Sequence, residues 1–86
     1  MRIKEGYLLR EVAGAHVVVP VGQVDFDGMI KLNETGVILW KKLEQDTTKG
    51  ALVEALLAEY EVDRETAERD VTTYLAKLKE AGILYE

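Results

Sequence analysis

GMIKLNETGVILWKKLE, the stretch from residue 28 to residue 44, changes its hydrophobic period in the middle. In its first part Ile30 and Leu32 fall on one side and Lys31 on the other, which is the alternation of a half-buried strand. Asn33 then opens a segment in which small and apolar residues recur at helical spacing: Gly36, Leu39, Trp40 and Leu43. The stretch therefore predicts a strand over residues 29–32 that is joined to a helix with no linker.

Two more strands are predicted upstream of this stretch. The segments YLLREV (residues 7–12) and HVVVP (residues 16–20) are rich in β-branched and aromatic residues, and the short connection AGA between them suits a hairpin. Pro20 has no N–H to donate, so it should end its strand or lie at an edge. Asp27 followed by Gly28 favours a tight turn into the last strand. These segments together predict a three-stranded antiparallel sheet.

Three helices are predicted to follow the sheet, and the first should run to about residue 44 or 45 and bury Trp40. The expected N-caps are Asn33 for the first helix, Asp46, Thr47 or Thr48 for the second, and Asp63 for the third. Gly82 supplies the expected stop of the third helix. The residues expected to face inward are Leu52, Val53, Leu56, Leu57 and Tyr60 on the second helix, and Ala67, Val71, Leu75 and Leu78 on the third.

The order of these elements determines the expected fold class. Strands come first and helices follow, without the alternation that a parallel sheet requires, so the fold should be α+β. With 86 residues, 48% of them hydrophobic and 31% charged, the chain suits one domain over residues 1–86. The second and third helices also resemble a helix-turn-helix pair, and together with the sheet they predict a winged-helix-like arrangement.

Composition excludes several kinds of active site. The sequence has no cysteine and no serine, and His16 is its single histidine, so thiolate metal sites and serine or cysteine nucleophiles are ruled out. Asp25 and Asp27 could suggest a weak cation site, but a metal needs more ligands and the turn already explains Asp27. No catalytic residue, metal or cofactor is therefore expected, and His16 should have a structural or surface role.

Charge and hydropathy limit the expected partners. No signal-peptide pattern opens the sequence and no apolar run approaches the roughly 18 residues of a membrane span, so a cytoplasmic protein without membrane contact is expected. The net charge is −5, from 16 acidic and 11 basic residues, which counts against nucleic acid as the main partner. The pairs Lys41 with Lys42 and Lys77 with Lys79 are more typical of solvated helix faces than of a phosphate-binding patch.

The last predicted strand and the third helix supply the candidate binding surface. If residues 29–32 form a sheet edge, their unpaired N–H and C=O groups can pair with another extended chain, which is how strand addition captures peptides. Tyr74 lies on the flank of the third helix's apolar face, together with Asp70, Lys77 and Ala81. This flank suits either the rim of a groove or an ordinary helix boundary.

Taken in order, these segments resemble the PqqD family, named for its role in pyrroloquinoline quinone biosynthesis, whose members are also called RiPP recognition elements. The matching residues are Leu32 and Asn33 followed by Gly36 and the apolar VILW, then LVEALLAEY, and finally YLAKLKEAGIL. The resemblance covers about residues 5–85, and it rests on the order and spacing of the segments rather than on one motif.

The resemblance implies a winged-helix-like domain that binds the leader segment of a ribosomally made precursor peptide. In that family the leader adds as a further strand beside the third strand, lies against the third helix and is presented to a modifying enzyme, often a radical S-adenosylmethionine enzyme. By position, the implied peptide-binding residues are Met29, Ile30, Lys31, Asp70, Tyr74 and Lys77. Peptide products in general are favoured over pyrroloquinoline quinone itself.

Two other function classes stay open on the sequence. A winged-helix DNA-binding regulator is favoured by the helix pair, and it is opposed by the net charge and by the lack of a basic recognition helix. An enzyme in its own right is the weakest hypothesis, because nucleophile, metal-ligand and cofactor signatures are absent. A non-catalytic protein that recognises leader peptides is the leading prediction.

Overall fold

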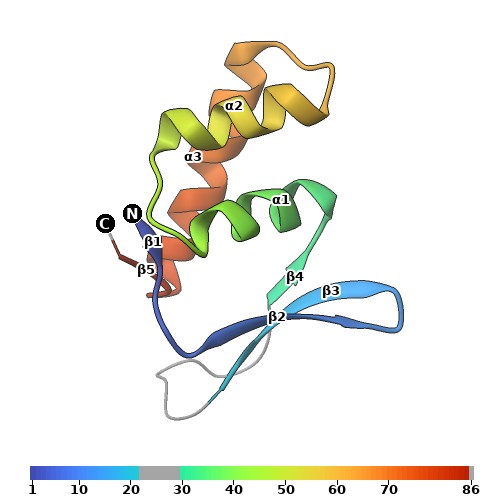
Figure 1. Cartoon of the computed structure of the whole chain (residues 1–86), viewed down its shortest axis with the longest axis vertical. Helices are drawn as coiled ribbons and strands as arrows, with labels where there is room; N and C mark the ends of the chain where they lie inside the picture. The colour runs from blue at the N-terminus through green and yellow to red at the C-terminus, as the bar shows by residue number, and fades with distance from the viewer. Residues whose placement is uncertain (22–29, 86) are drawn as a thin grey trace.

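A computed structural model describes residues 1–21 and 30–85 of the chain. The elements follow in the order β1 (Arg2–Ile3), β2 (Tyr7–Val12), β3 (Ala15–Pro20), β4 (Ile30–Leu32), α1 (Glu34–Leu43), α2 (Lys49–Glu59), α3 (Arg64–Glu80) and β5 (Leu84–Tyr85). Figure 1 shows the three-stranded sheet β2-β3-β4 at one end of the molecule and α2 with the start of α3 at the other. The predicted fold, a three-stranded antiparallel sheet followed by three helices, is confirmed.

The sheet begins with a hairpin that is closed by a two-residue turn. Ala13 and Gly14 have φ angles of 52° and 81°, so both are in the left-handed conformation that a type I′ turn requires. The backbone twist of such a turn matches the twist of the two paired strands. Both strand pairs of the sheet are antiparallel. β3 ends at Pro20, as its missing N–H predicted. The predicted turn at Asp27 lies outside the described residues, and so does Met29.

One face of the sheet covers the hydrophobic core. The residues of this face that belong to the core or pack against it are Tyr7, Leu9, Val18, Ile30 and Leu32. Successive strand residues point to opposite faces, so Arg10 and Lys31 lie on the other face, and both are exposed. The alternation that the sequence showed around Lys31 is therefore the alternation between core and solvent.

The three helices begin at the expected kind of cap. The Asn33 side chain accepts a hydrogen bond from the Gly36 N–H at 2.8 Å, and the Asp63 side chain accepts one from the Thr66 N–H at the same distance. Of the three candidates for the second helix, Thr48 is the cap. Each of these side chains satisfies an N–H that has no partner inside its helix.

Gly82 ends α3 as predicted. Its φ of 74° is left-handed, and the reversal lets the Ile83 N–H donate to the Leu78 carbonyl at 3.0 Å while the Gly82 N–H donates to the Lys79 carbonyl, also at 3.0 Å. This pair of bonds is the Schellman arrangement, for which glycine is the preferred residue. The turn directs the chain back across the bottom of α3 into β5.

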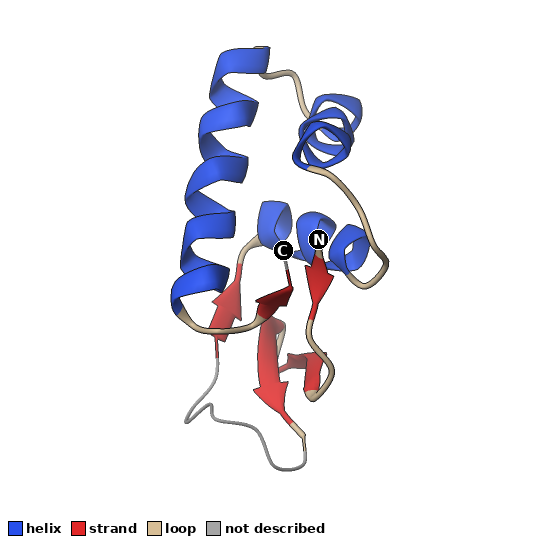
Figure 2. Ribbon diagram, turned by 90° about the vertical axis from the view of Figure 1, so that its left-hand side faces the viewer, coloured by secondary structure: helices blue, strands red, loops and turns tan. Residues whose placement is uncertain are grey.

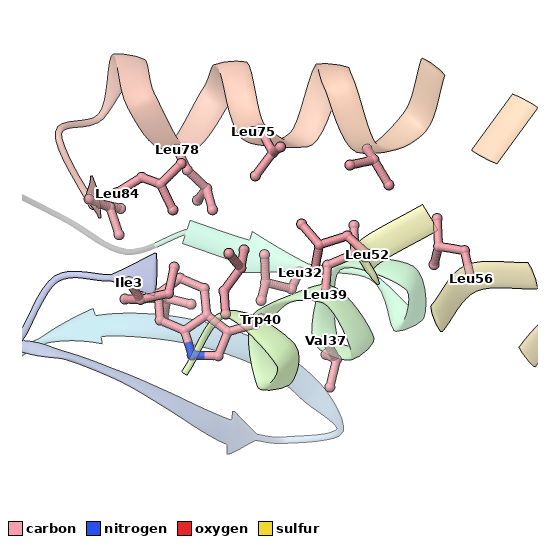
Figure 3. Packing of buried hydrophobic residues seen from close by; sticks show 14 of the residues in the cluster. Ile3, Leu32, Val37, Leu39, Trp40, Leu52, Leu56, Leu75, Leu78 and Leu84 are labelled. Atoms are coloured by element: carbon pink, nitrogen blue, oxygen red, sulfur yellow. The ribbon is translucent and has the colours of Figure 1, made fainter. Parts of the chain in front are cut away.

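Each helix buries one stripe of apolar side chains in a common core. Figure 3 shows Leu75 and Leu78 of α3 pointing toward Leu32 of β4 and Leu39 of α1. Trp40 is 1% exposed, so the prediction of a core tryptophan is confirmed. The four residues expected to face inward on α3 are all buried. The strand β4 is therefore held between the rest of the sheet and two helices.

A second, two-stranded sheet of β1 and β5 was not predicted. Ile3 pairs with Leu84 in antiparallel register, and both side chains enter the core. The Tyr85 ring lies 5.0 Å from the Arg2 guanidinium and 5.5 Å from the Lys4 ammonium, measured to the ring centroid. Two residues are too few to show a period-two pattern, which is why the sequence indicated only an extended end over residues 83–86.

Candidate functional site

The strand β4 is an edge of the described sheet. It pairs with β3 on one side, and in the strand order β2-β3-β4 no further strand follows it within residues 1–21 and 30–85. An edge strand has a row of backbone N–H and C=O groups without ladder partners. The edge of β4 can therefore accept an additional strand.

The register shows which backbone groups of β4 point outward. Val21 donates its N–H to the Gly6 carbonyl at 2.8 Å, and the pairing then continues without interruption to the two-residue turn. In an antiparallel ladder, bonded and non-bonded pairs alternate, so the pair of Arg10 with Val17 is a bonded one. The N–H and C=O of Val17 therefore point toward β2 and away from β4.

Lys31 lies directly opposite Val17 in the pairing of β3 with β4. Because the polar groups of Val17 point the other way, this pair is not hydrogen-bonded, and the N–H and C=O of Lys31 face the open edge. Ile30 and Leu32 are paired with Val18 and His16, and they use their polar groups to bind β3. Lys31 thus presents one donor and one acceptor to a strand that would lie beside β4.

A groove runs between this edge and the C-terminal half of α3. Figure 2 shows the lower part of α3 beside β4, the strand that leads upward into α1. The groove contains a pocket of about 470 Å³, and its lining residues come from β4, the start of α1 and α3: Ile30, Lys31, Leu32, Asn33, Gly36, Tyr74, Lys77 and Leu78. An open edge with an apolar pocket beside it is the arrangement that strand addition needs.

Tyr74 is fixed across the groove by a hydrogen bond to the opposite helix. Its hydroxyl donates to the Gly36 carbonyl of α1 at 2.9 Å. The side chain is half-buried, and this burial raises the pKa of the Tyr74 phenol above its ordinary value. The phenol is therefore protonated at neutral pH and keeps its donor role, which holds the ring in one position on the floor of the groove.

Gly36 lets α1 lie close to β4. A Cβ atom at this position would lie 3.3 Å from the Asn33 Oδ1 and 3.3 Å from two carbons of Leu32. These distances are shorter than ordinary van der Waals contact, so a side chain here would push the strand and the helix apart or distort the Asn33 cap. The glycine also leaves the groove open at the place where Tyr74 spans it.

A second pocket of about 290 Å³ extends the groove along α3. It shares Tyr74 and Lys77 with the first pocket and adds residues farther toward the start of α3, among them Arg69, Asp70 and Thr73. Arg69 is weakly paired with Glu65 of its own helix at 3.9 Å. The two pockets therefore adjoin each other, and the second adds charged side chains beside the middle of α3.

The predicted site residues mostly lie together. Ile30, Lys31, Tyr74 and Lys77 line the first pocket, and Asp70 lines the adjoining one with Tyr74 and Lys77. Met29 lies outside the described residues. Whether these residues bind a peptide remains a prediction, but their proximity across two elements that are about 40 residues apart in sequence is a feature of the structure.

Several groove residues were missed by the sequence analysis. Thr73 lies three residues after Asp70 and four before Lys77, and Arg69 lies four residues before Thr73, so helical spacing could have found both. Gly36 and Asn33 were assigned to helix packing and capping alone, although both also line the groove. No local signal indicates that a capping residue will border a pocket, because that depends on the position of α3.

Of the remaining sequence candidates, His16 lies in the part of the chain that the structure describes. Among residues 1–21 and 30–85, no group of three or more His, Asp or Glu side chains is placed to hold a metal ion. His16 is partly exposed, with its Nε2 3.8 Å from a Glu11 carboxylate oxygen. Asp25 and Asp27 lie outside the described residues. In the same part of the chain, none of the helices has both the length and the hydropathy of a membrane span.

Comparison with known proteins gives matches at the level of family and fold. Residues 15–84 match the family model described as coenzyme PQQ synthesis protein D (PqqD). The chain is similar to the structure of TbiB1 in complex with the TbiA(beta) leader peptide, with a TM-score of 0.81, 27% identity, and coverage of 100% of this chain and 99% of that chain. No curated protein is significantly similar to the sequence.

A second similar structure is that of lasso peptide synthetase B1 complexed with the leader peptide. The TM-score is 0.78, the identity is 24%, and the match covers 99% of this chain and 96% of that chain. At this identity the likeness concerns the fold alone. Both matches extend over nearly the whole of each chain, so the two-stranded sheet, the three-stranded sheet and the three helices are compared together.

Proposed function

The chain belongs to the family of coenzyme PQQ synthesis protein D (PqqD), whose model matches residues 15–84, and from this membership we propose that it recognises a peptide. The ligand is the leader segment of a ribosomally made precursor peptide. The leader adds as a further strand beside β4 and lies against α3. The observation that supports this most strongly is the outward N–H and C=O of Lys31, next to a groove of about 470 Å³.

In the proposed binding mode, the backbone and the side chains that line the groove have separate roles. The backbone of Lys31 supplies main-chain hydrogen bonds, which any extended peptide can use, so it contributes affinity rather than selectivity. Ile30, Tyr74 and Lys77 border the space beside the edge and contact the side chains of the peptide. Asp70 contacts the part of the peptide that continues along α3. The structure of TbiB1 with a leader peptide supports this mode by its similarity in fold.

The domain, which we take to comprise residues 1–86, has no catalytic role in this proposal. Its task is to present the bound precursor to a modifying enzyme, for which a radical S-adenosylmethionine enzyme is one candidate class. Recognition of a newly made ribosomal peptide would take place in the cytoplasm. The runner-up function, a DNA-binding regulator, is opposed at the groove, because the cations that line its described part, Lys31, Lys77 and Arg69, are too few to neutralise a row of phosphates.

Proline at Lys31 tests the proposed binding mode. Proline removes the N–H that faces the open edge and fixes φ, so Lys31→Pro should remove one of the two main-chain hydrogen bonds that Lys31 offers a guest strand. The sheet itself loses no ladder bond, because the Lys31 N–H does not bind β3. Titration calorimetry with the leader of a precursor encoded beside the gene should show at least a tenfold loss of affinity, which is about 1.4 kcal/mol.

The matched control is Glu11→Pro on the opposite edge of the sheet. Glu11 is exposed, and its pair with His16 in β3 is a non-bonded one by the same alternation, so its N–H also points outward. This variant should keep the affinity of the parent. A folded Lys31→Pro protein that binds the leader as tightly as the parent would show that the peptide lies on another face.

A further inference from the structure

The side chains of a guest strand beside β4 would alternate between two different environments. Residues directly opposite each other in neighbouring strands point to the same face of the sheet. The guest residue opposite Lys31 therefore points to the outer face, with the Lys31 side chain beside it. The guest residues before and after it lie opposite Ile30 and Leu32 and point to the inner face, where the groove is.

The outer-face position beside Lys31 is cationic. Lys31 is exposed, and within the described residues it takes part in no ion pair. Glu34 borders the same shallow pocket as Lys31 near the hairpin end, but the two side chains are not paired. The next side chains across the sheet on this face are Val17 and then Arg10, which adds a second positive charge rather than a counter-ion.

The inner-face positions are apolar. Ile30, Leu32, Tyr74 and Leu78 border the pocket there, and Lys77 is the one charged side chain on this side among the described residues that line it. The Tyr74 hydroxyl is already engaged by Gly36, so the floor has no free donor from this residue for a polar guest side chain. Burying an unpaired polar group in such a place is unfavourable, whereas an apolar side chain gains from burial.

Within residues 1–21 and 30–85, the acidic excess of the sequence lies mainly away from this edge. Residues 54–70 contain seven carboxylates and two arginines. The net charge of this segment is therefore −5, the same as that of the entire chain. Figure 1 places this segment, the end of α2 and the start of α3, at the end of the molecule away from the sheet. Lys31 and Lys77 border the edge from its two faces, so an acidic peptide is attracted to the edge and repelled from the far end.

We propose that the recognised segment has the pattern apolar–acidic–apolar, with the acidic side chain paired to Lys31 on the outer face and the two apolar side chains in the groove. This preference rests on the proposed function, since it needs a guest strand beside β4. Lys31 thus has two separate roles, because its backbone binds any strand and its side chain selects the charge of the residue opposite. The apolar neighbours fix the register that brings the acidic residue to Lys31.

A random-peptide display library, selected on the purified protein, supplies the probes for the test. Each selected peptide is synthesised with Asp, Asn or Lys at successive positions, and its affinity is measured by fluorescence anisotropy. One position between two apolar residues should prefer Asp over Asn by about two- to fivefold, the size of an exposed cross-strand ion pair, and should disfavour Lys further. The preference should shrink at high salt.

Lys31→Glu should reverse the order at that position, so that Lys binds better than Asp. The control, Lys42→Glu, makes the same change at an exposed lysine of α1 that borders neither pocket, and it should leave the order unchanged. Thermal melts of both variants should match the parent, because both side chains are exposed.

The outcomes separate this inference from the proposed function. Peptides that lose binding on Lys31→Pro but show no charge preference, or keep their order on Lys31→Glu, would overturn the inference and leave the proposed function intact. Peptides that keep their affinity on Lys31→Pro, or a library that yields no binder, would overturn both.

Discussion

Tyr74 has a structural role through its hydroxyl and, in the proposed function, a recognition role through its ring. The hydroxyl connects α3 to α1 through the Gly36 carbonyl at 2.9 Å. The ring borders both pockets of the groove. Removal of the hydroxyl alone should therefore affect stability, whereas removal of the ring should affect peptide binding as well.

Tyr74→Phe should lower the free energy of unfolding by about 0.5–1.5 kcal/mol at neutral pH, because one hydrogen bond is lost. Burial raises the pKa of Tyr74 in the folded state. The unfolded chain then releases its proton first as the pH rises past about 10, so the stabilising contribution of the phenol is complete below that pH and declines above it. The parent should thus become less stable relative to Tyr74→Phe in alkaline solution.

Urea unfolding of both proteins between neutral pH and about pH 11 measures this difference. The other tyrosines are common to both proteins and cancel in the comparison. Tyr74→Ala is the control for the ring, and it should weaken leader binding by about 1–2 kcal/mol while Tyr74→Phe changes it little. A stability difference that stays constant over the whole pH range would show that the burial of the phenol has no energetic consequence.

At the scale of elements, the fold and the candidate site both depend on Asn33, which lies at the junction of β4 and α1. Asn33 separates the strand from the helix, and its side chain caps α1 by accepting from the Gly36 N–H. Leu32 on one side of it is buried in the core, and Lys31 beyond that presents the open edge. Loss of the Asn33 cap should therefore also affect the open edge of β4.

Asn33→Ala should lower the free energy of unfolding by about 1 kcal/mol and should also weaken leader binding, because the end of β4 loses its anchor. Thr48→Ala removes the corresponding cap of α2, where the Thr48 hydroxyl accepts from the Ala51 N–H at 3.1 Å, far from the groove. It should cost a similar stability with no change in affinity. Chemical denaturation and calorimetry on both variants give the comparison, and equal losses of affinity would contradict a special role for the junction.

The elements themselves could largely be predicted from the sequence, because their signals are local. β2 matches residues 7–12, α3 begins after Asp63 and ends before Gly82, and the caps lie one residue from the helices they serve. The sequence offered three candidate N-caps for the second helix, and only the structure shows that Thr48 is the cap. β3 begins at Ala15, one residue earlier than expected, because the turn uses only Ala13 and Gly14.

The candidate site could be predicted only in part, because it depends on contacts between distant elements. Helical spacing placed Tyr74 and Lys77 on one flank, but the position of that flank beside β4 is set by the burial of Leu75 and Leu78 in the common core. The direction of the Lys31 N–H follows from the register of the strands. The two-residue turn at Ala13 sets this register, and a pattern of alternating residues does not determine it.

At the scale of the whole molecule, the charge is separated along the long axis. The net charge of residues 54–70 is −5, and Figure 1 places this segment at the end of the molecule away from the sheet. In a DNA-binding winged-helix protein, the second helix of the helix-turn-helix pair enters the major groove. The corresponding helix here is α3, and its first turn contains the acidic residue Glu65. Phosphates would be repelled from that end.

Duplex DNA should therefore bind weakly, with a dissociation constant no tighter than the usual non-specific range of about 10⁻⁴–10⁻⁶ M, even at low salt where the electrostatic attraction is largest. Fluorescence anisotropy with a labelled random duplex measures this. Replacement of Glu61 and Glu65 by Lys should increase the affinity, because it removes charge from the repelling end. Submicromolar, salt-sensitive binding by the unaltered protein would make the regulator the better hypothesis.

In the proposed binding mode, the cap of α1 should also limit how long a bound peptide stays. The Asn33 side chain accepts from the Gly36 N–H and its carbonyl accepts from the Val37 N–H at 3.0 Å, so Lys31 is the last described residue of β4 whose N–H and C=O both face the open edge. Related interfaces differ in affinity mainly through their dissociation rates, and few main-chain bonds mean rapid escape. In the proposed function the domain releases its precursor to an enzyme in every cycle, and a short ladder that the first turn of α1 ends is suited to such turnover.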